Sequence, residues 1–320
     1  MASDALVTIG VTCFDARDTI LRALKSASAQ DWPAIEIVVV DDCSKDGSAE
    51  IVRDFIASDA RARLIQHREN LGFAAALNTV LAHACGEFVA LFDDDDESLP
   101  NRVREQVRVL SQYETITGSR LVACYASGER RYPNGYRVDS PAIGMRGPVP
   151  KGPAVAEYLL VFKRQPGWFY GAGTPACALL ARRTTFEAMG GFDPNLRRRQ
   201  DVDFAVRLAL RGGHFIGTTE RLYIRHMTGG AEKSAEAILA AWSALAEKHR
   251  AYLQGICRYD YALRWPRLRY WHFKRRYARF ALEFLRLLLR NPVEATRHIL
   301  ATGPARLIHE HKMRKRLSTR

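Results

Sequence analysis

The feature that most constrains the fold is a regular alternation of strand-like and helix-like segments over the first hundred residues. "LVTIGVTC", "EIVVV" and "EFVALF" are apolar and partly β-branched, which is typical of strands. Segments with apolar residues at helical spacing lie between them, at 19–30, 48–60 and 72–85. This rhythm predicts an α/β fold with a doubly wound, mainly parallel, Rossmann-like sheet and right-handed crossovers.

Two acidic clusters follow predicted strands. "DDCS" covers residues 41–44, and "DDDD" covers residues 93–96. The carboxyl ends of parallel strands form the edge where such sheets bind ligands. Two unit charges 4 Å apart repel by about 1 kcal/mol in water, and more strongly in a partly buried site. The row at 93–96 is therefore either a solvated loop or half of a cation site, and its position favours the cation.

Known cation and nucleotide motifs narrow the choice. A calcium EF-hand loop needs glycine at its sixth position, where the two possible registers have Ser98 and Leu99. The chain has neither a GxxxxGK[ST] loop nor a GxGxxG fingerprint. What remains is Mg²⁺ or Mn²⁺ held by one or two carboxylates together with the oxygens of a substrate diphosphate.

Four segments in order resemble the bacterial-type family 2 glycosyltransferases, which have the GT-A fold and use nucleotide-sugars. The resemblance covers roughly residues 5–228. It is carried by "VVVDDCSKDGS", by "ENLGFAAALN", by "FVALFDDDDESLP" as a D-x-D motif, and by "FEAMGGFDPNLRRRQDVDF" as the acceptor-side motif. One such motif is weak, but four at the family spacing are specific.

The resemblance implies roles for individual residues. Asp42 would contact the nucleotide base, Asp94 the ribose and Asp95 the metal, with Asp93 and Asp95 as the outer pair of the D-x-D motif, and Asp201 would be the catalytic base. The nucleotide-sugar site would then comprise Thr12, Phe14, Asp42, Asn70, Asn78, Asp93 and Asp94. Two departures stand out: Gln200 replaces a glutamate before the base, and Phe14–Asp15 replaces a tyrosine–asparagine pair.

Other candidates have alternative interpretations. His226 either completes the metal site or is a packing or surface histidine. Trp168 and Tyr170, in "PGWFYGAGTP", either stack on an acceptor sugar or form a packed loop corner. Asp201 itself fits a first-turn acid that stabilises its helix. One base without a second carboxylate nucleophile indicates direct displacement with inversion, and the base supplies about 10²–10⁴-fold.

The net positive charge of the chain comes entirely from its last quarter. Residues 1–247 carry 29 Lys and Arg against 31 Asp and Glu, whereas residues 248–320 carry 19 against 4. We therefore predict two domains: a catalytic domain at 1–230, with a nucleotide-sugar half to about 115 and an acceptor half at 116–230, and a basic helical extension at 231–320. Breaks are expected near Pro266, Pro292 and Pro304.

One segment of this extension, at 270–290, is a basic amphipathic helix. It has Arg276, Arg279, Arg286 and Arg290 among apolar residues such as Phe280, Phe284 and Leu288. Such a helix either packs on the catalytic domain or lies on an anionic membrane. Nucleic-acid binding ranks last, because no motif for it is present.

The sequence therefore predicts an inverting, metal-dependent glycosyltransferase. Its donor would be a nucleotide-diphosphate sugar, with a UDP-sugar favoured, and its acceptor a glycan or lipid-linked hydroxyl. The scattered cysteines, the absence of a signal-like start in "MASDALVTIG" and the lack of a long apolar run favour the cytoplasm, at the inner face of the membrane. The alternatives are a sugar-1-phosphate nucleotidylyltransferase, or a membrane- or nucleic-acid-binding protein with a degenerate transferase domain.

Overall fold

The computed structural model describes residues 5–227 and 234–317. The chain forms two compact units. The first comprises Met1–Arg131, Arg137–Ala156 and Gln165–His226, and the second comprises Tyr132–Tyr136, Glu157–Arg164 and Met227–Arg320. The sequence assigned 132–136 and 157–164 to the acceptor half, and it set the domain boundary at 230/231, which lies outside the described residues.

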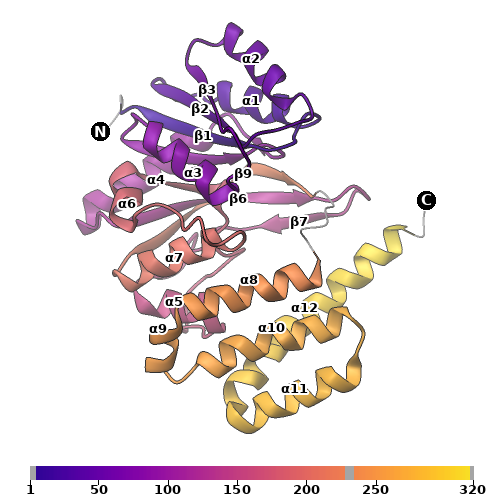
Figure 1. Ribbon diagram of the computed structural model, residues 1–320. Coiled ribbons are helices and arrows are strands. Elements are labelled where there is room, and N and C mark those ends of the chain that lie inside the picture. The colour runs from indigo at the N-terminus through magenta and orange to yellow at the C-terminus, as the bar shows by residue number, and fades with distance from the viewer. Residues whose placement is uncertain (1–4, 228–233, 318–320) are drawn as a thin grey trace. The chain divides into compact units, whose positions relative to one another are not determined.

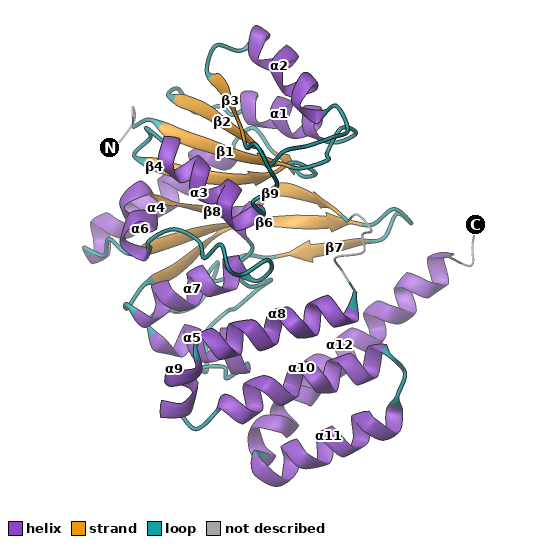
Figure 2. Cartoon of the chain, viewed as in Figure 1, coloured by secondary structure: helices purple, strands orange, loops and turns teal. Residues whose placement is uncertain are grey.

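One nine-stranded sheet organises the first unit (Figures 1 and 2). Its strand order is β3-β2-β1-β4-β8-β6-β9-β5, with β7 paired to β6. The strands are β1 Val7–Cys13, β2 Ile35–Asp41, β3 Ala62–Gln66, β4 Phe88–Asp93, β5 Glu97–Ser98, β6 Val122–Arg131, β7 Arg137–Ser140, β8 Leu179–Arg182 and β9 His214–His226. The β3-β2-β1-β4 half is parallel, as the sequence predicted.

The other half of the sheet is mixed. The short strand β8 runs antiparallel to both β4 and β6, while β6 and β9 are parallel. Antiparallel neighbours need no helical crossover, which suits a segment that enters from a loop through the 3₁₀ turn η1 (Ala176–Ala178). The α/β architecture with a helical C-terminal region agrees with the sequence prediction.

Helices cover both faces of the sheet. The helices of this unit are α1 Ile20–Ser28, α2 Ser48–Ser58, α3 Phe73–His83, α4 Arg102–Thr117, α6 Arg183–Met189 and α7 Gln200–Leu210, and α5 (Pro153–Val161) is shared between the units. Ile9 and Val11 of β1 share a buried cluster with residues of α1, α2 and α4. Gly10 points to the opposite face, where a Cβ would lie 2.2 Å from Val80 of α3. Glycine therefore permits the close approach of α3.

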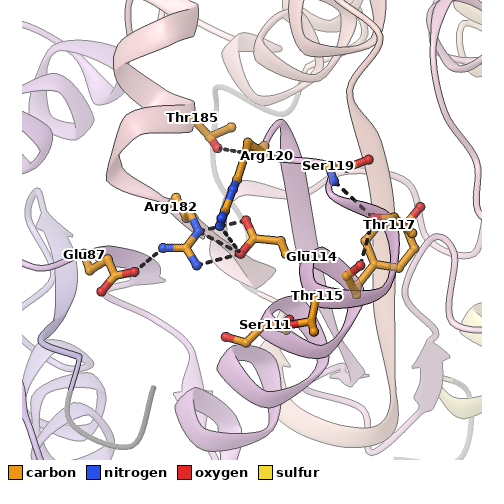
Figure 3. A network of polar contacts seen from close by, with 10 residues as sticks. Glu87, Ser111, Glu114, Thr115, Thr117, Ser119, Arg120, Arg182 and Thr185 are labelled. Atoms are coloured by element: carbon orange, nitrogen blue, oxygen red, sulfur yellow. Dashed lines mark hydrogen bonds and ion pairs between the residues drawn. The ribbon is translucent and has the colours of Figure 1, made fainter. Parts of the chain in front are cut away.

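A buried ion-pair network joins α4 to β8 (Figure 3). Arg182 donates from Nε to both oxygens of Glu114, at 2.8 Å each, and from Nη2 to Oε2 at 2.6 Å. Arg182 also pairs with Glu87, and Arg120 approaches Glu114 at 3.5 Å. The Glu114 side chain is only 3% exposed, so its charge depends on these arginines for compensation.

Glu114→Ala is expected to destabilise the protein by about 3–5 kcal/mol, because it leaves Arg182 partly buried without its main partner. Glu187→Ala, which removes the exposed partner of Arg183, is the matched control and should cost less than about 1 kcal/mol. Denaturant unfolding of both variants gives the comparison. A Glu114→Ala loss no larger than the control's contradicts a structural role for the network.

The second unit is helical. Its helices are α8 Ala235–Lys248, α9 Arg250–Gly255, α10 Tyr259–Phe273, α11 Tyr277–Arg290 and α12 Pro292–Leu317. Leu245, Leu253, Leu268 and Leu287 form part of its buried core. Among the described residues, no helix combines the length and the apolar character that crossing a bilayer requires.

Two of the predicted proline breaks are wrong. Pro292 begins α12, where a proline loses no helical hydrogen bond. Pro266 and Pro304, however, lie inside α10 and α12. Pro266 is itself buried, and packing within the unit outweighs the local cost of an interior proline.

Helix α11 packs through ion pairs, and several of its leucine side chains are exposed. Glu283 is buried and pairs with Arg264 of α10 at 3.1 Å. In contrast, Leu282, Leu285 and Leu289 are 49%, 53% and 76% exposed. Under the packing alternative of the sequence analysis, Phe280, Phe284 and Leu288 would form the apolar face that is covered. These three residues are half-buried, and the fully buried apolar position of the helix is Leu287.

Candidate active site

The acidic row lies where the parallel strands end. Strand β4 ends at Asp93, which is opposite Thr12 of β1, and Cys13 of β1 is opposite Asp41 of β2. The two acidic clusters therefore share one edge of the sheet. The backbone N–H of Phe14 donates to Oδ2 of Asp94 at 3.0 Å, so the segment after β1 is tied to the row.

The carboxylates of the row interact strongly with one another. The pKa of Asp94 is raised to about 8, first by burial and then by the charges of Asp93 and Asp95, against the opposing hydrogen bond from the Phe14 backbone. The pKa of Asp93 is also raised, first by burial and then by the charges of Asp95 and Asp201. Asp201 thus lies close enough to act on the row, although it comes from α7 more than a hundred residues later.

Two arginines that the sequence analysis missed offset this negative charge. The charges of Arg225 and Arg102 both lower the pKa of Asp93. Arg102 is 1% exposed, and it donates to Leu91 O at 3.0 Å and to Ser98 Oγ at 2.8 Å. Its guanidinium carbon also lies 4.2 Å from the centre of the Phe92 ring. Arg102 therefore holds β4, the strand that ends in the acidic row, in place.

A group that could hold a metal lies within the row. Among the described residues, Asp93, Asp96 and Cys177 bring one potential ligand atom each to within 4.8 Å of one another. Asp96 was not among the predicted ligands. It accepts from the His226 backbone N–H at 3.2 Å, and that bond brings the end of β9 to the acidic row.

The donor set fits a hard divalent cation. Oδ2 of Asp96 and Nε2 of His226 are buried and make no hydrogen bond. The charged atoms paired with them are Arg225 Nε at 4.0 Å and Glu97 Oε2 at 3.6 Å, both beyond hydrogen-bond length. Carboxylate oxygens are the ligands that Mg²⁺ and Mn²⁺ prefer, whereas a cysteine thiolate suits softer metals. Burial raises the pKa of Cys177, which keeps it a neutral thiol.

Asp42 organises the loop that begins α3. Its Oδ1 accepts from Leu71 N at 2.9 Å and from His67 Nδ1 at 2.7 Å, and its Oδ2 accepts from Gly72 N at 2.8 Å. Asp42 is 3% exposed, whereas Asn70 in the same loop is exposed. Asp42 thus holds the predicted nucleotide-binding loop in shape.

Asn78 has a partner that the sequence analysis did not foresee. Its amide nitrogen donates to Phe192 O at 2.7 Å, and its amide oxygen accepts from Phe192 N at 2.8 Å. Asn78 therefore clamps α3 to the segment that leads into α7. A direct contact between Asn78 and the nucleotide-sugar stays a prediction.

The first turn of α7 contains two aspartates with different surroundings. Asp203 is fully buried and accepts from Arg207 Nε at 2.8 Å, so it is the structural acid of this turn. Asp201 is half-buried, and its Oδ1 accepts from Val202 N at 2.8 Å. Asp203 therefore belongs to the core, whereas Asp201 is half-buried and its charge acts on Asp93 of the acidic row.

Two buried polar atoms belong to Gln200, which the sequence analysis noted, and to Tyr125, which it missed. The hydroxyl of Tyr125 and Oε1 of Gln200 are buried and make no hydrogen bond. The Asp201 charge contributes to raising the pKa of Tyr125, so the two side chains are close. An unsatisfied buried polar group costs stability, and such groups cluster where a substrate completes the bonding.

The predicted acceptor aromatics are arranged as a packed corner. Tyr170 is 2% exposed, and its hydroxyl accepts from Gln165 N at 3.0 Å. Trp168 is half-buried, with its ring centre 6.2 Å from that of Tyr170. Of the two, Trp168 is the side chain with surface left for a sugar.

The fold defined by these elements is the GT-A fold. S. aureus TarS 1–349, solved with UDP-GlcNAc, matches with a TM-score of 0.58 at 20% identity, covering 83% of this chain and 73% of that one. The mannosyltransferase PcManGT from Pyrobaculum calidifontis, solved with GDP-Man and Mn²⁺, has a TM-score of 0.55 at 19% identity, over 95% and 81% of the two chains. At these identities the similarity concerns the fold alone.

The family follows from the sequence comparison. The family model described as "Glycosyl transferase family 2" matches residues 8–176, more than half of the chain. This chain therefore belongs to glycosyl transferase family 2, as the sequence analysis inferred. Membership removes the nucleotidylyltransferase alternative.

Two relatives show how far the sequence similarity extends along the chain. EpsE of Bacillus subtilis (strain 168), classed as a glycosyltransferase, is 28% identical over 231 residues, which are 70% of this chain and 73% of EpsE. The Escherichia coli UDP-Glc:alpha-D-GlcNAc-diphosphoundecaprenol beta-1,3-glucosyltransferase WfgD is 29% identical over 136 residues, 40% of this chain and 53% of WfgD. The chain thus matches about half the length of WfgD.

Proposed function

We propose that this protein is an inverting, metal-dependent glycosyltransferase that transfers a sugar from a nucleoside-diphosphate sugar to a hydroxyl of a glycan or lipid-linked acceptor. The observation that supports the proposal is the acidic row at the edge of the sheet where the parallel strands end, together with the contribution of the Asp201 charge to the raised pKa of Asp93. A UDP-sugar is the favoured donor, since WfgD is named for UDP-Glc and TarS binds UDP-GlcNAc.

The residues divide the chemistry between two sides. Asp42 and its loop hold the nucleotide side, with Asp94 at the ribose. Asp95, supported by Asp93, Asp96 and His226, would hold Mn²⁺ or Mg²⁺, which offsets the charge that develops on the leaving diphosphate. On the acceptor side, Asp201 takes the proton from the attacking hydroxyl. With a single carboxylate in this role, attack is direct and the anomeric configuration inverts.

A ligand screen tests the donor half of the proposal. A nucleoside diphosphate that binds the folded state at a hundred times its dissociation constant stabilises it by about 2.7 kcal/mol. We expect UDP with Mn²⁺ to raise the melting temperature, and UDP with excess EDTA to raise it much less. Equal shifts in the two conditions contradict the metal-dependent site.

We further propose that the second unit attaches the enzyme peripherally to an anionic membrane at the inner face of the cell membrane. The exposed Leu282, Leu285 and Leu289 lie along α11 beside Arg286 and Arg290, which combines apolar and basic side chains on the surface of one helix. Such a combination suits the interface of an anionic bilayer. WfgD, which is named for a diphosphoundecaprenol acceptor, illustrates a relative that acts on a lipid-linked sugar.

The triple variant L282S/L285S/L289S is expected to lose most binding to anionic vesicles while keeping donor binding. The matched control is Ile116→Ser on α4, since Ile116 is 74% exposed and Leu289 is 76% exposed. Co-sedimentation with anionic and neutral vesicles at low and high salt measures the effect, because the attraction weakens as salt rises. Full-length protein that ignores anionic vesicles at low salt contradicts the membrane proposal. Truncation at residue 248 is less informative, since it would remove α10, on which α8 packs.

A further inference from the structure

The second unit contains a large apolar cavity. Its volume is about 650 Å³, within the range of about 300–1,000 Å³ that is typical of small-molecule sites. The residues around it come from α10 and α12, from the end of α5 and the residue after it, and from single positions of α8 and α11. They include Tyr158, Phe162, Trp242, Trp265, Phe280 and Ile299. All of them belong to the second unit.

One wall of the cavity is a stack of rings around His298. The imidazole lies between the rings of Phe162 and Trp265, with centre-to-centre distances of 4.2 and 3.4 Å. Nδ1 of His298 is 2.9 Å from the hydroxyl of Tyr261. Burial lowers the pKa of His298 to about 3, and the charges of Arg269 and Arg164 contribute. This wall is therefore neutral near pH 7, and its rings are held in place.

The charged residues around the cavity are all basic. Arg269 and Arg306 line it, and no aspartate or glutamate is among its described lining residues. The guanidinium carbon of Arg306 lies 4.2 Å from the centre of the Phe273 ring. Arginine binds phosphate through several directed N–H donors. The surroundings are therefore complementary to an apolar group that ends in an anion.

Part of the lining is exposed. Phe273, Leu307 and Leu300 line the cavity and yet are 37%, 62% and 67% exposed. Large apolar side chains that border a cavity and remain in contact with water indicate a surface that a ligand covers. The cavity is thus open to the outside along an apolar border.

We propose that this cavity binds one hydrocarbon chain of a lipid phosphate, with Arg269 and Arg306 contacting the phosphate. The volume fits a single chain of drug-like size better than the two chains of a phospholipid. Identifying this lipid as the carrier of the sugar acceptor rests on the proposed function, whereas the binding of the chain does not.

Chain-length dependence tests the binding itself. Full-length protein is titrated with alkyl phosphates of eight to fourteen carbons, below their micelle concentrations, and with inorganic phosphate alone. Burial of a methylene contributes about 0.8 kcal/mol, so each added carbon should tighten binding by up to about fourfold until the cavity is full. Inorganic phosphate should show no measurable binding. Affinity that does not depend on chain length overturns the proposal.

A cavity-filling variant locates the site. Gly303 lines the cavity, and an added Cβ there makes only ordinary contacts at 3.8 Å with Ile299. Gly303→Leu should therefore weaken dodecyl phosphate binding by at least about tenfold without straining the backbone. Gly255→Leu is the matched control, because no atom lies within 4 Å of the added Cβ. Equal binding by the two variants overturns the assignment of this cavity.

If the melting temperature of Gly303→Leu is lower than that of Gly255→Leu, a second variant tests the site. Arg306→Gln removes one basic group from the cavity lining and should reduce the preference for dodecyl phosphate over dodecanol. A two-chain phosphatidic acid that competes as strongly as dodecyl phosphate contradicts the single-chain proposal.

The cavity proposal and the transferase proposal can be tested independently of each other. Asp201→Asn should leave alkyl phosphate binding unchanged. Gly303→Leu, in turn, should raise KM for a lipid-linked acceptor and not for a short water-soluble one.

Discussion

Replacing Asp201 with asparagine is expected to lower sugar transfer by about 10²–10⁴-fold, the usual contribution of a general base. Asparagine keeps the size of the side chain, and its amide oxygen can still accept the bond from Val202 N, which is 2.8 Å in the wild type. The start of α7 should therefore stay folded. Donor affinity should be unchanged, because the substitution leaves the nucleotide side intact. Single-turnover transfer and UDP calorimetry on the same preparation separate the two effects.

The neighbouring acid of the same helical turn supplies the control. Asp203 is buried against Arg207, whose Nη2 also donates to Gly191 O at 2.7 Å. Asp203→Asn should lower stability by weakening this contact, and whatever activity it loses should follow the loss of folded protein. Asp201→Asn should show the reverse: normal melting and little transfer. An Asp201→Asn variant that keeps more than about a tenth of wild-type turnover excludes a general base at this position.

The location of the two acidic clusters at the ends of neighbouring strands could be predicted from the sequence, because it depends on local patterns. Strand-like segments that end in aspartates bring Asp42 and Asp93 to one edge of a parallel sheet, wherever the rest of the chain goes. The parallel pairing of β3, β2, β1 and β4 and the location of the acidic row at a strand end both follow from that pattern. The mixed half of the sheet does not, because β8 is four residues long and pairs with strands far away in sequence.

The residues that the sequence did not reveal act through distant contacts. Arg102 is the first residue of α4, and an arginine in the first turn of a helix is usually solvated. It is buried because Phe92 and Tyr223, the latter about 120 residues later, both lie under its guanidinium. Tyr125 likewise reads as one apolar residue of a strand. Its significance appears only when its unbonded hydroxyl is found near Asp201.

Replacing Asp95 with alanine is expected to remove the metal-dependent part of UDP binding. Loss of outer-shell partners alone weakens metal sites by about 10–100-fold, so loss of a direct ligand should weaken Mn²⁺-dependent UDP affinity by more than about 100-fold. The fold should be preserved, since Asp95 is half-buried beyond the end of β4, and its backbone oxygen, which accepts from Arg22 at 2.6 Å, is unchanged. Calorimetry with UDP, with and without Mn²⁺, measures the loss.

Asp96→Asn is the informative comparison, because the potential ligand atoms of Asp96, Asp93 and Cys177 lie within 4.8 Å of one another. If Asp95 is the main ligand, Asp95→Ala abolishes the effect of Mn²⁺ and Asp96→Asn reduces it. Asparagine keeps an oxygen that can accept the 3.2 Å bond from the His226 backbone, so the end of β9 should stay in place. The opposite ranking would be Mn²⁺-dependent affinity that is intact in Asp95→Ala and lost in Asp96→Asn. That result would assign the metal to the buried Asp96 instead of Asp95. Asp95 would then have no part in binding the diphosphate.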